Sequence, residues 1–124
     1  MSSDQLSKNK QVVSDFFAVV YGNGDDLHKF DDLIAEDYIQ HNPHVDQGRE
    51  GVRRFFEQEI KSPDRLDPRE TLEVNLIAEG DLVVRQEIRT QGMLIDVFRV
   101  RDGQLQEHWD AYRPNPGTER HPAL

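Results

Sequence analysis

The chain has 124 residues, of which 35% are hydrophobic and 31% charged, which is the length and balance of one globular domain. A formal charge of −9 argues against nucleic-acid binding, because it offers no basic surface to a phosphate backbone. The lack of cysteine excludes disulfides, thiolate nucleophiles and cysteine-ligated metal. No apolar run is long enough for a membrane span and no signal-like segment is visible, so a cytoplasmic protein is expected.

Apolar residues recur at helical spacing in three segments of the first half of the chain. The first helix is expected to run from Gln5 to Tyr21, with Ser2 at the capping-box position before it. A second, short helix fits Asp26 to Glu36, and a third fits Arg49 to Ile60. Three N-terminal helices are therefore predicted.

Strand patterns dominate the second half. A brief extended segment, Tyr38 to His41, precedes the third helix. Apolar and polar residues then alternate with period two, which predicts strands at Leu72–Ala78, Leu82–Thr90, Met93–Arg101 and Gln104–Tyr112. The pair Asp102-Gly103 is a strong hairpin signal between the last two. Helices followed by an antiparallel meander predict an α+β domain. Residues 1–113 form this single domain, and residues 114–124 are expected to be a loose tail.

Two stretches of the chain carry a family resemblance. The first is Tyr-Ile-Gln-His-Asn-Pro at 38–43, followed by Gly-Arg-Glu-Gly at 48–51 and a phenylalanine-rich helix. The second and more specific one runs from Asp96 to Asp110, with Asp-Gly at a hairpin tip and His-Trp-Asp after it. Both resemble the SnoaL-like polyketide cyclases, a branch of the nuclear-transport-factor-like superfamily. The order of elements is similar from about Gln5 to Arg113.

The resemblance implies a fold and a chemistry. The helices would pack on a curved, mainly antiparallel sheet that forms a half-open conical barrel with an internal pocket, and homodimers would be the common assembly. In the polyketide cyclases of this branch, an aspartate in the last strand is the general acid/base of an intramolecular aldol ring closure. Asp110 matches that position. A pocket histidine of those cyclases falls near Asp96, where this chain has an aspartate instead.

Asp110 is the leading catalytic candidate on chemical grounds as well. A carboxylate that is desolvated among aromatic side chains has a raised pKa, which suits proton transfer next to a carbonyl group. Trp109 would brace the strand from the other face. The alternative is a strand-end aspartate paired with a surface arginine such as Arg113.

His108 and Asp96 are expected to assist Asp110, and the position of Asp96 depends on the register of the hairpin. A two-residue turn at Asp102-Gly103 places Asp96 opposite Trp109, facing away from His108. A three-residue loop with a bulge at the glycine places Asp96 opposite His108 instead. We favour the bulge because it brings the three side chains onto one face. The alternative is a partly exposed polar face.

Five more side chains are expected to contact a ligand. Tyr38 and His41 belong to a region that commonly lines the pocket mouth in the superfamily, although His41 fits equally well as a residue that bonds its own loop. Phe98 and Tyr112 are expected on the pocket side of their strands, and Phe17 in the pocket wall.

The predicted function is a cofactor-free acid/base enzyme that acts on a small hydrophobic or polyketide-like carbonyl compound by cyclisation, isomerisation or a lyase step. No metal is expected, because the spacing of His41, His44 and Asp46 matches no strong ligand motif. No phosphate loop supports a nucleotide, and neither nucleic acid nor membrane is an expected partner. Two alternatives stay open: a pocket that binds without turnover, and a domain whose sheet pairs with another protein.

Overall fold

The computed structural model describes residues 2–116, which form three α-helices and one five-stranded sheet. The elements are α1 (Ser3–Val20), η1 (Leu27–Lys29), α2 (Phe30–Leu33), β1 (Ile34–Gln40), α3 (Gly48–Glu59), η2 (Pro68–Glu70), β2 (Thr71–Glu79), β3 (Leu82–Arg89), β4 (Gly92–Arg101) and β5 (Gln104–Pro114). The strand order is β1-β5-β4-β3-β2. Only the β1–β5 pair is parallel. The expected α+β class is confirmed, with a mixed and mainly antiparallel sheet.

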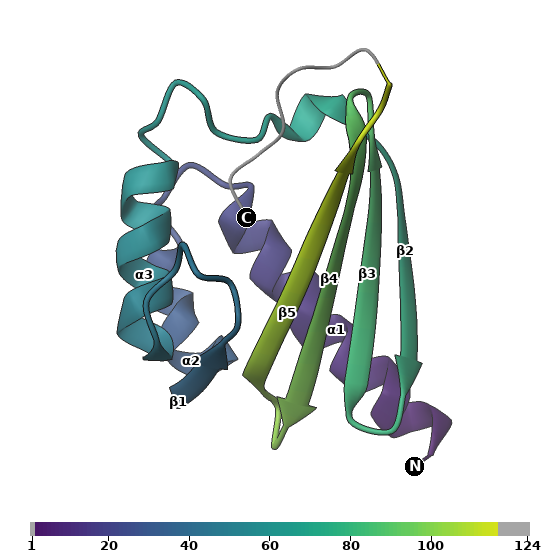
Figure 1. Ribbon diagram of the computed structural model, residues 1–124. Helices are drawn as coiled ribbons and strands as arrows, with labels where there is room; N and C mark the ends of the chain where they lie inside the picture. The colour runs from purple at the N-terminus through teal and green to yellow at the C-terminus, as the bar shows by residue number, and fades with distance from the viewer. Residues whose placement is uncertain (1, 117–124) are drawn as a thin grey trace.

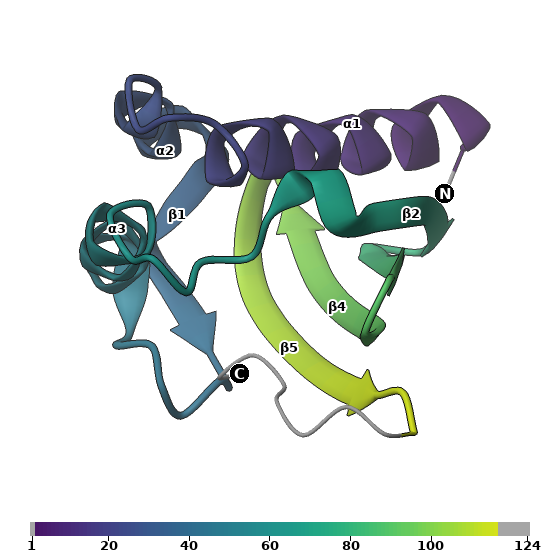
Figure 2. The same cartoon turned by 90° about the horizontal axis from the view of Figure 1, so that it is seen from above.

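The sheet curves around the first helix. Figure 1 shows α1 crossing one face of β2 to β5, while α2 and α3 gather at the β1 edge of the sheet. Figure 2 shows β4 and β5 bending beneath α1. The two edge strands of the described sheet, β1 and β2, are not paired with each other. Closure into a conical barrel therefore stays a prediction.

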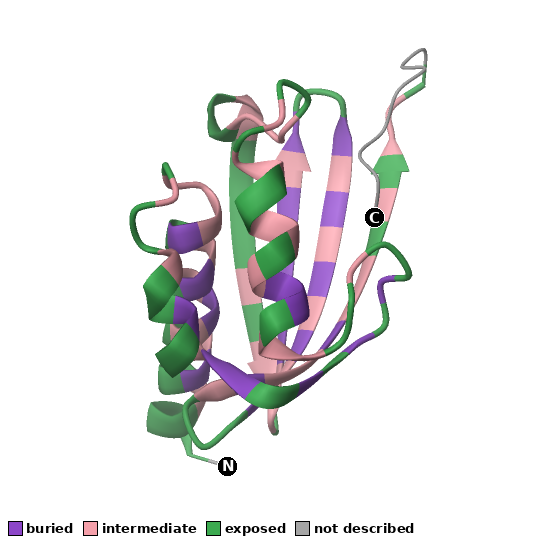
Figure 3. Cartoon of the chain, turned by 90° about the vertical axis from the view of Figure 1, so that its left-hand side faces the viewer, coloured by how far each residue is buried: buried purple, intermediate pink, exposed green. Residues whose placement is uncertain are grey.

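Periodicity explains most of these elements. In α1, the buried residues Val13, Phe16 and Val19 recur every three residues, and the Ser2 hydroxyl accepts a hydrogen bond from the Gln5 backbone N–H at 3.1 Å. Strands β3 and β4 alternate between buried and half-buried residues (Figure 3). No helix within residues 2–116 is long and apolar enough to cross a membrane.

The second predicted helix is wrong over its last part. It was expected to reach Glu36, but α2 ends at Leu33 and β1 begins at Ile34. Ile34 is fully buried and pairs with Leu105 of β5. Burial in the sheet therefore outweighs the local helical spacing. At the other end of the chain, β5 continues through Pro114, and residues 117–124 of the expected tail lie outside the described residues.

A buried charged cluster lies on the concave face of β3. Glu87 is completely buried and accepts hydrogen bonds from Arg85, Arg89, Tyr21 and Thr71. The two arginines are themselves buried. The three charged residues of this strand are therefore paired with one another inside the fold, two guanidinium groups to one carboxylate.

Glu87 is expected to stabilise the fold in a pH-dependent way. Burial raises the pKa of Glu87, but hydrogen bonds from Arg85, Arg89 and Tyr21 outweigh burial and hold the pKa below its ordinary value of 4.5. The ionised group therefore stabilises the fold above pH 4.5, and this contribution is lost as the pH falls through the lowered pKa.

We expect Glu87→Gln to lower the free energy of unfolding at neutral pH by roughly 3 to 5 kcal/mol, because two buried guanidinium groups lose their counter-charge. The difference from the parent should narrow as the pH falls below 4.5. Urea denaturation over a pH series measures both effects. Glu57→Gln, at an exposed position of α3, is the matched control. A Glu87→Gln protein as stable as the parent at neutral pH would contradict the assignment.

Candidate active site

A cavity of about 300 Å³ lies between α1, α3 and the concave face of the sheet. This volume is at the small end of ligand pockets, which span about 300 to 1,000 Å³. Most of its wall is apolar, and five phenylalanines contribute to it: Phe16, Phe17, Phe55, Phe56 and Phe98. One wall is polar instead and carries Asp96, His108 and Asp110. An apolar cavity with a few convergent polar groups is the usual form of a small-molecule site.

The hairpin between β4 and β5 sets the polar wall. Its turn has two residues, Asp102 and Gly103, both with positive φ, and Arg101 pairs with Gln104. A bulge at Gln106 then shifts the register by one residue.

The bulge decides which side chains meet. Beyond it, Asp96 lies opposite Asp110, and Phe98 lies opposite His108. The expected pairing of Asp96 with His108 is therefore wrong, because the bulge follows a two-residue turn and does not belong to the turn itself. Asp96, His108 and Asp110 nevertheless lie together on the concave face, which is the grouping that was predicted from the favoured register.

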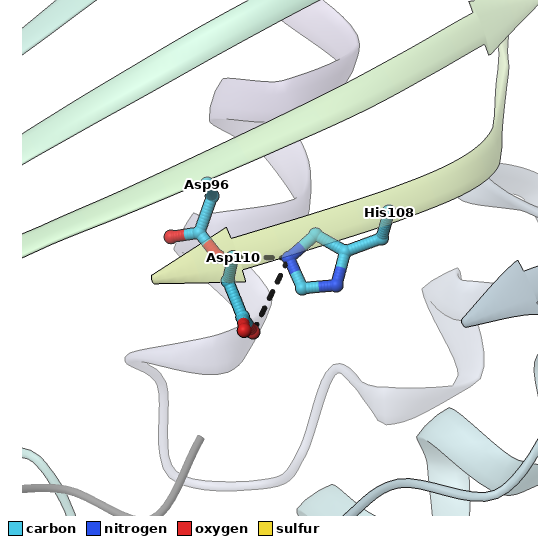
Figure 4. A group of neighbouring side chains, drawn as sticks. All are labelled: Asp96, His108 and Asp110. Carbon is cyan, nitrogen blue, oxygen red and sulfur yellow. Dashed lines mark hydrogen bonds and ion pairs between the residues drawn. The ribbon is translucent and has the colours of Figure 1, made fainter. Parts of the chain in front are cut away.

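The three side chains are in contact. The Nε2 atom of His108 lies 2.8 Å from Oδ1 of Asp96 and 3.7 Å from Oδ2 of Asp110 (Figure 4). The imidazole ring also stacks on Phe98, with 4.6 Å between ring centroids. Strand β4 supplies one carboxylate and β5 supplies the other carboxylate and the imidazole.

Two amides of the β1 segment hold the cluster from the other side. Gln40 pairs with His108 in the sheet, and its Oε1 lies 2.8 Å from Nδ1 of His108. Asn42 donates from Nδ2 to Oδ2 of Asp110 at 3.0 Å. Neither amide was among the site residues predicted from the sequence. Strand alternation was the available signal, because residues 38, 40 and 42 fall on one face of an extended segment and residue 41 on the other.

Asp96 is the member of the cluster with an unsatisfied hydrogen-bonding atom. It is 5% exposed, and its Oδ2 has no hydrogen-bond partner among the described residues. Burial raises the pKa of Asp96, the charge of Asp110 raises it further, and the hydrogen bond with His108 opposes both. A buried acid with a raised pKa in a cavity wall is a functional-site signal.

Tyr38 adds a hydroxyl to the same cavity. It is buried, and burial raises the pKa of its hydroxyl well above the ordinary value, helped by the negative charges of Asp96 and Asp110. The hydroxyl therefore stays protonated and can donate a hydrogen bond to a bound molecule.

The other expected ligand contacts divide between cavity and surface. Phe17 and Phe98 line the cavity, as expected. His41 does not line it, because its ring stacks on Trp109 at 4.9 Å and its Nε2 lies 2.7 Å from Glu107 on the outer face. Tyr112 lies on the concave face beyond the cavity and lines a separate, more open groove. The charged residues of that groove, such as Arg89, mostly bond one another or the backbone.

Asp96, His108 and Asp110 are also the described residues whose ligand atoms lie close enough to hold a metal ion, within 4.8 Å of one another. The 2.8 Å separation of His108 Nε2 and Asp96 Oδ1 is a hydrogen-bond distance. The cluster therefore has the geometry of groups that share a proton. The segment with His41, His44 and Asp46 does not form such a group.

A buried, incompletely bonded acid should cost stability. Because the folded-state pKa of Asp96 lies above its ordinary value of 3.8, ionising it destabilises the fold increasingly as the pH rises through the raised pKa. We therefore expect the stability of Asp96→Asn relative to the parent to increase with pH. Denaturation curves at several pH values measure this difference, with Asp25→Asn at an exposed site as the control. A relative stability that falls with rising pH would contradict the assignment.

Comparisons with known proteins agree with this fold. The SnoaL-like domain model matches residues 13–108. No curated protein sequence matches the chain. A candidate SnoaL-like polyketide cyclase from Jannaschia sp. CCS1 superposes with a TM-score of 0.70 at 20% identity, covering 90% of each chain. TsrD from Streptomyces laurentii superposes with a TM-score of 0.60 at 23% identity, covering 86% of this chain and 88% of TsrD.

An LEH-like epoxide hydrolase of M. tuberculosis has the same fold, with a TM-score of 0.63 at 15% identity over 86% of this chain and 79% of its own. At these identities the solved structures establish the fold and leave the activity open. The domain match spans most of the chain. The protein belongs to the family of SnoaL-like domains.

Proposed function

We propose that this protein is a cofactor-free acid/base enzyme that acts on a small carbonyl compound, by aldol-type cyclisation or isomerisation. The observation that carries the proposal is the contact of two carboxylates and one imidazole in the wall of an aromatic cavity. The cavity volume favours a compact ligand over an extended polyketide chain. The cytoplasmic location expected from the sequence is part of the same proposal.

Asp110 is the proposed base. Its side chain is 10% exposed and lines the cavity, so a bound carbon acid can approach it while most water is excluded. Asp110 takes a proton from a carbon next to a carbonyl group and returns it to the oxygen that becomes an alkoxide. His108 and Asp96 tune this step, and the Tyr38 hydroxyl donates to the carbonyl oxygen as charge develops on it.

Hydrolysis of a small epoxide is the second candidate. It is favoured by the direct pairing of Asp96 with Asp110 across β4 and β5, with the His108 ring between their carboxylates. One acid can protonate the epoxide oxygen while the other carboxylate takes a proton from water. A binding protein without turnover is the non-catalytic alternative, and it predicts that the parent protein binds a ligand without converting it.

Asp110→Asn should abolish most turnover without abolishing binding. The amide keeps the shape of the side chain but cannot accept the proton, so the turnover number should fall roughly 100- to 10,000-fold. A panel of small diketones, polyketide-like esters and epoxides supplies the substrate, and calorimetry supplies the binding constant.

Asp37→Asn is the matched control, because Asp37 is exposed on β1 and bonds Gln106 away from the cavity. Activity of the parent should survive chelation, since the proposal needs no metal. A substrate that Asp110→Asn converts at the parent rate would show that Asp110 is not the base.

The outer face of the sheet supports a proposed homodimer. Ile77, Val84, Val97 and Trp109 are paired in one row across β2, β3, β4 and β5. Ile77 is 62% exposed, although it is a large apolar side chain in a row of paired residues that crosses four neighbouring strands. A second copy of the chain would cover this row.

We expect light scattering at micromolar concentration to give twice the 14.4 kDa mass of one chain. Val97→Glu, in the centre of the row, should shift the mass to that of one chain, because a dimer would bury its charge without a partner. Leu72→Glu, on the exposed part of β2, should leave the dimer intact. A parent protein that is monomeric under these conditions would refute the dimer.

A further inference from the structure

Two side-chain amides beside the active site have fixed orientations. The backbone N–H of Asn42 donates to Oε1 of Gln40 at 3.0 Å. The backbone N–H of His44 donates to Oδ1 of Asn42 at 2.8 Å. A backbone N–H can only donate, so each of these amide atoms must be the oxygen. Gln47 fixes the backbone of Gln40 as well, because its side chain bonds both the N–H and the C=O of that residue.

The orientation of Gln40 determines where His108 carries its proton. Oε1 of Gln40 also lies 2.8 Å from Nδ1 of His108. An amide oxygen has no proton to give, so Nδ1 must be the donor in this contact. In the neutral ring, Nε2 is then the unprotonated nitrogen, and it faces Oδ1 of Asp96 at 2.8 Å.

Two unprotonated acceptors at this distance would repel each other. A hydrogen bond between Nε2 and Oδ1 needs one proton, carried either by the ring or by the carboxyl group. The burial of Asp96 and its unpartnered Oδ2 disfavour a second charge beside Asp110. Asp110 differs, because it accepts a hydrogen bond from the fixed Asn42 amide.

We propose that Gln40 is a positioning residue that keeps Nδ1 of His108 protonated, so that one proton is held between His108 and Asp96. This pair is then the general acid of the site, and Asp110 is the general base. The role of the donor rests on the proposed function, whereas the proton positions do not. The site would then protonate an oxygen and deprotonate a carbon of the same substrate, which suits a compound with both groups a few ångströms apart.

The other charged and titratable groups around the pair fit this arrangement. Arg85 lies opposite Asp96 on β3, and its charge is already neutralised in part by Glu87. Tyr38 on β1 keeps its proton and therefore adds no negative charge. Asp110 is the carboxylate nearest the ring after Asp96.

The test uses the full-length chain labelled with ¹⁵N and needs no substrate. Long-range ¹H–¹⁵N spectra distinguish protonated from unprotonated ring nitrogens, and His108→Gln assigns the signals of this ring among the five histidines. The parent should show a protonated Nδ1. Gln40→Leu should convert Nδ1 to the unprotonated form, because Nε2–H can then donate to Asp96. Gln40→Glu keeps an acceptor oxygen and should keep Nδ1 protonated.

A parent protein with an unprotonated Nδ1 overturns the proposal, and so does a Gln40→Leu spectrum identical to that of the parent. If Gln40→Leu does not fold, the spectra of the parent and of Gln40→Glu still show whether Nδ1 of His108 is protonated. The proton shared by Nε2 of His108 and Asp96 is located by two measurements. Infrared difference spectra of the parent and Asp96→Asn show whether the Asp96 carboxyl group is protonated, and the ¹⁵N spectra show whether Nε2 is protonated. One of the two is expected, and finding neither overturns the shared proton. Inactivity toward every substrate, with these spectra as expected, would refute the enzyme and leave the proton assignment standing.

Discussion

The candidate site depends on the bulge at Gln106. Without it, the two-residue turn at Asp102-Gly103 would place Asp96 opposite Trp109 and direct it to the outer face. With it, Asp96 and Asp110 lie side by side on the concave face, and His108 lies between their carboxylates. One extra residue on β5 therefore decides whether Asp96 and Asp110 meet on the concave face. The parallel strand β1 then completes the site, because it brings its two amides to the same row.

Two buried polar clusters lie on the concave face, and they differ in how well they are satisfied. Glu87 accepts hydrogen bonds from four side chains and its pKa is lowered, so its ionised form stabilises the fold. Asp96 has one unpartnered oxygen and its pKa is raised, so its ionised form costs stability. The contrast supports a catalytic reading of the second cluster, because both lie in the same sheet at similar depth.

Much of the fold follows from the sequence, because amphipathic spacing is a local property. The predicted limits of α1, α3 and the four antiparallel strands agree with the structure to within two residues. The start of β1 at Ile34 and its parallel pairing with β5 were missed, because they depend on contacts about 70 residues away in the chain. The bulge position was missed for a similar reason: a two-residue turn signal says nothing about irregularity further along the strand.

The site was predictable only in part. Asp96, His108 and Asp110 could be selected from the sequence because their side chains can act as acids or bases. The resemblance to a known family then made Asp110 the leading candidate. His41 was grouped with Tyr38, although three residues along a strand place them on opposite faces. Gln40 and Asn42 escaped notice because amides carry no charge to titrate, and their importance comes from backbone donors that fix their orientation.

Proton transfer by Asp110 can be measured directly as deuterium exchange in D₂O at the carbon next to the carbonyl of a small cyclic ketone that exchanges slowly by itself, followed by NMR. If Asp110 is the base, the parent protein accelerates exchange, and the Asp110→Asn protein exchanges the ketone at the uncatalysed rate. Equal acceleration by the two proteins would show that Asp110 is not the base.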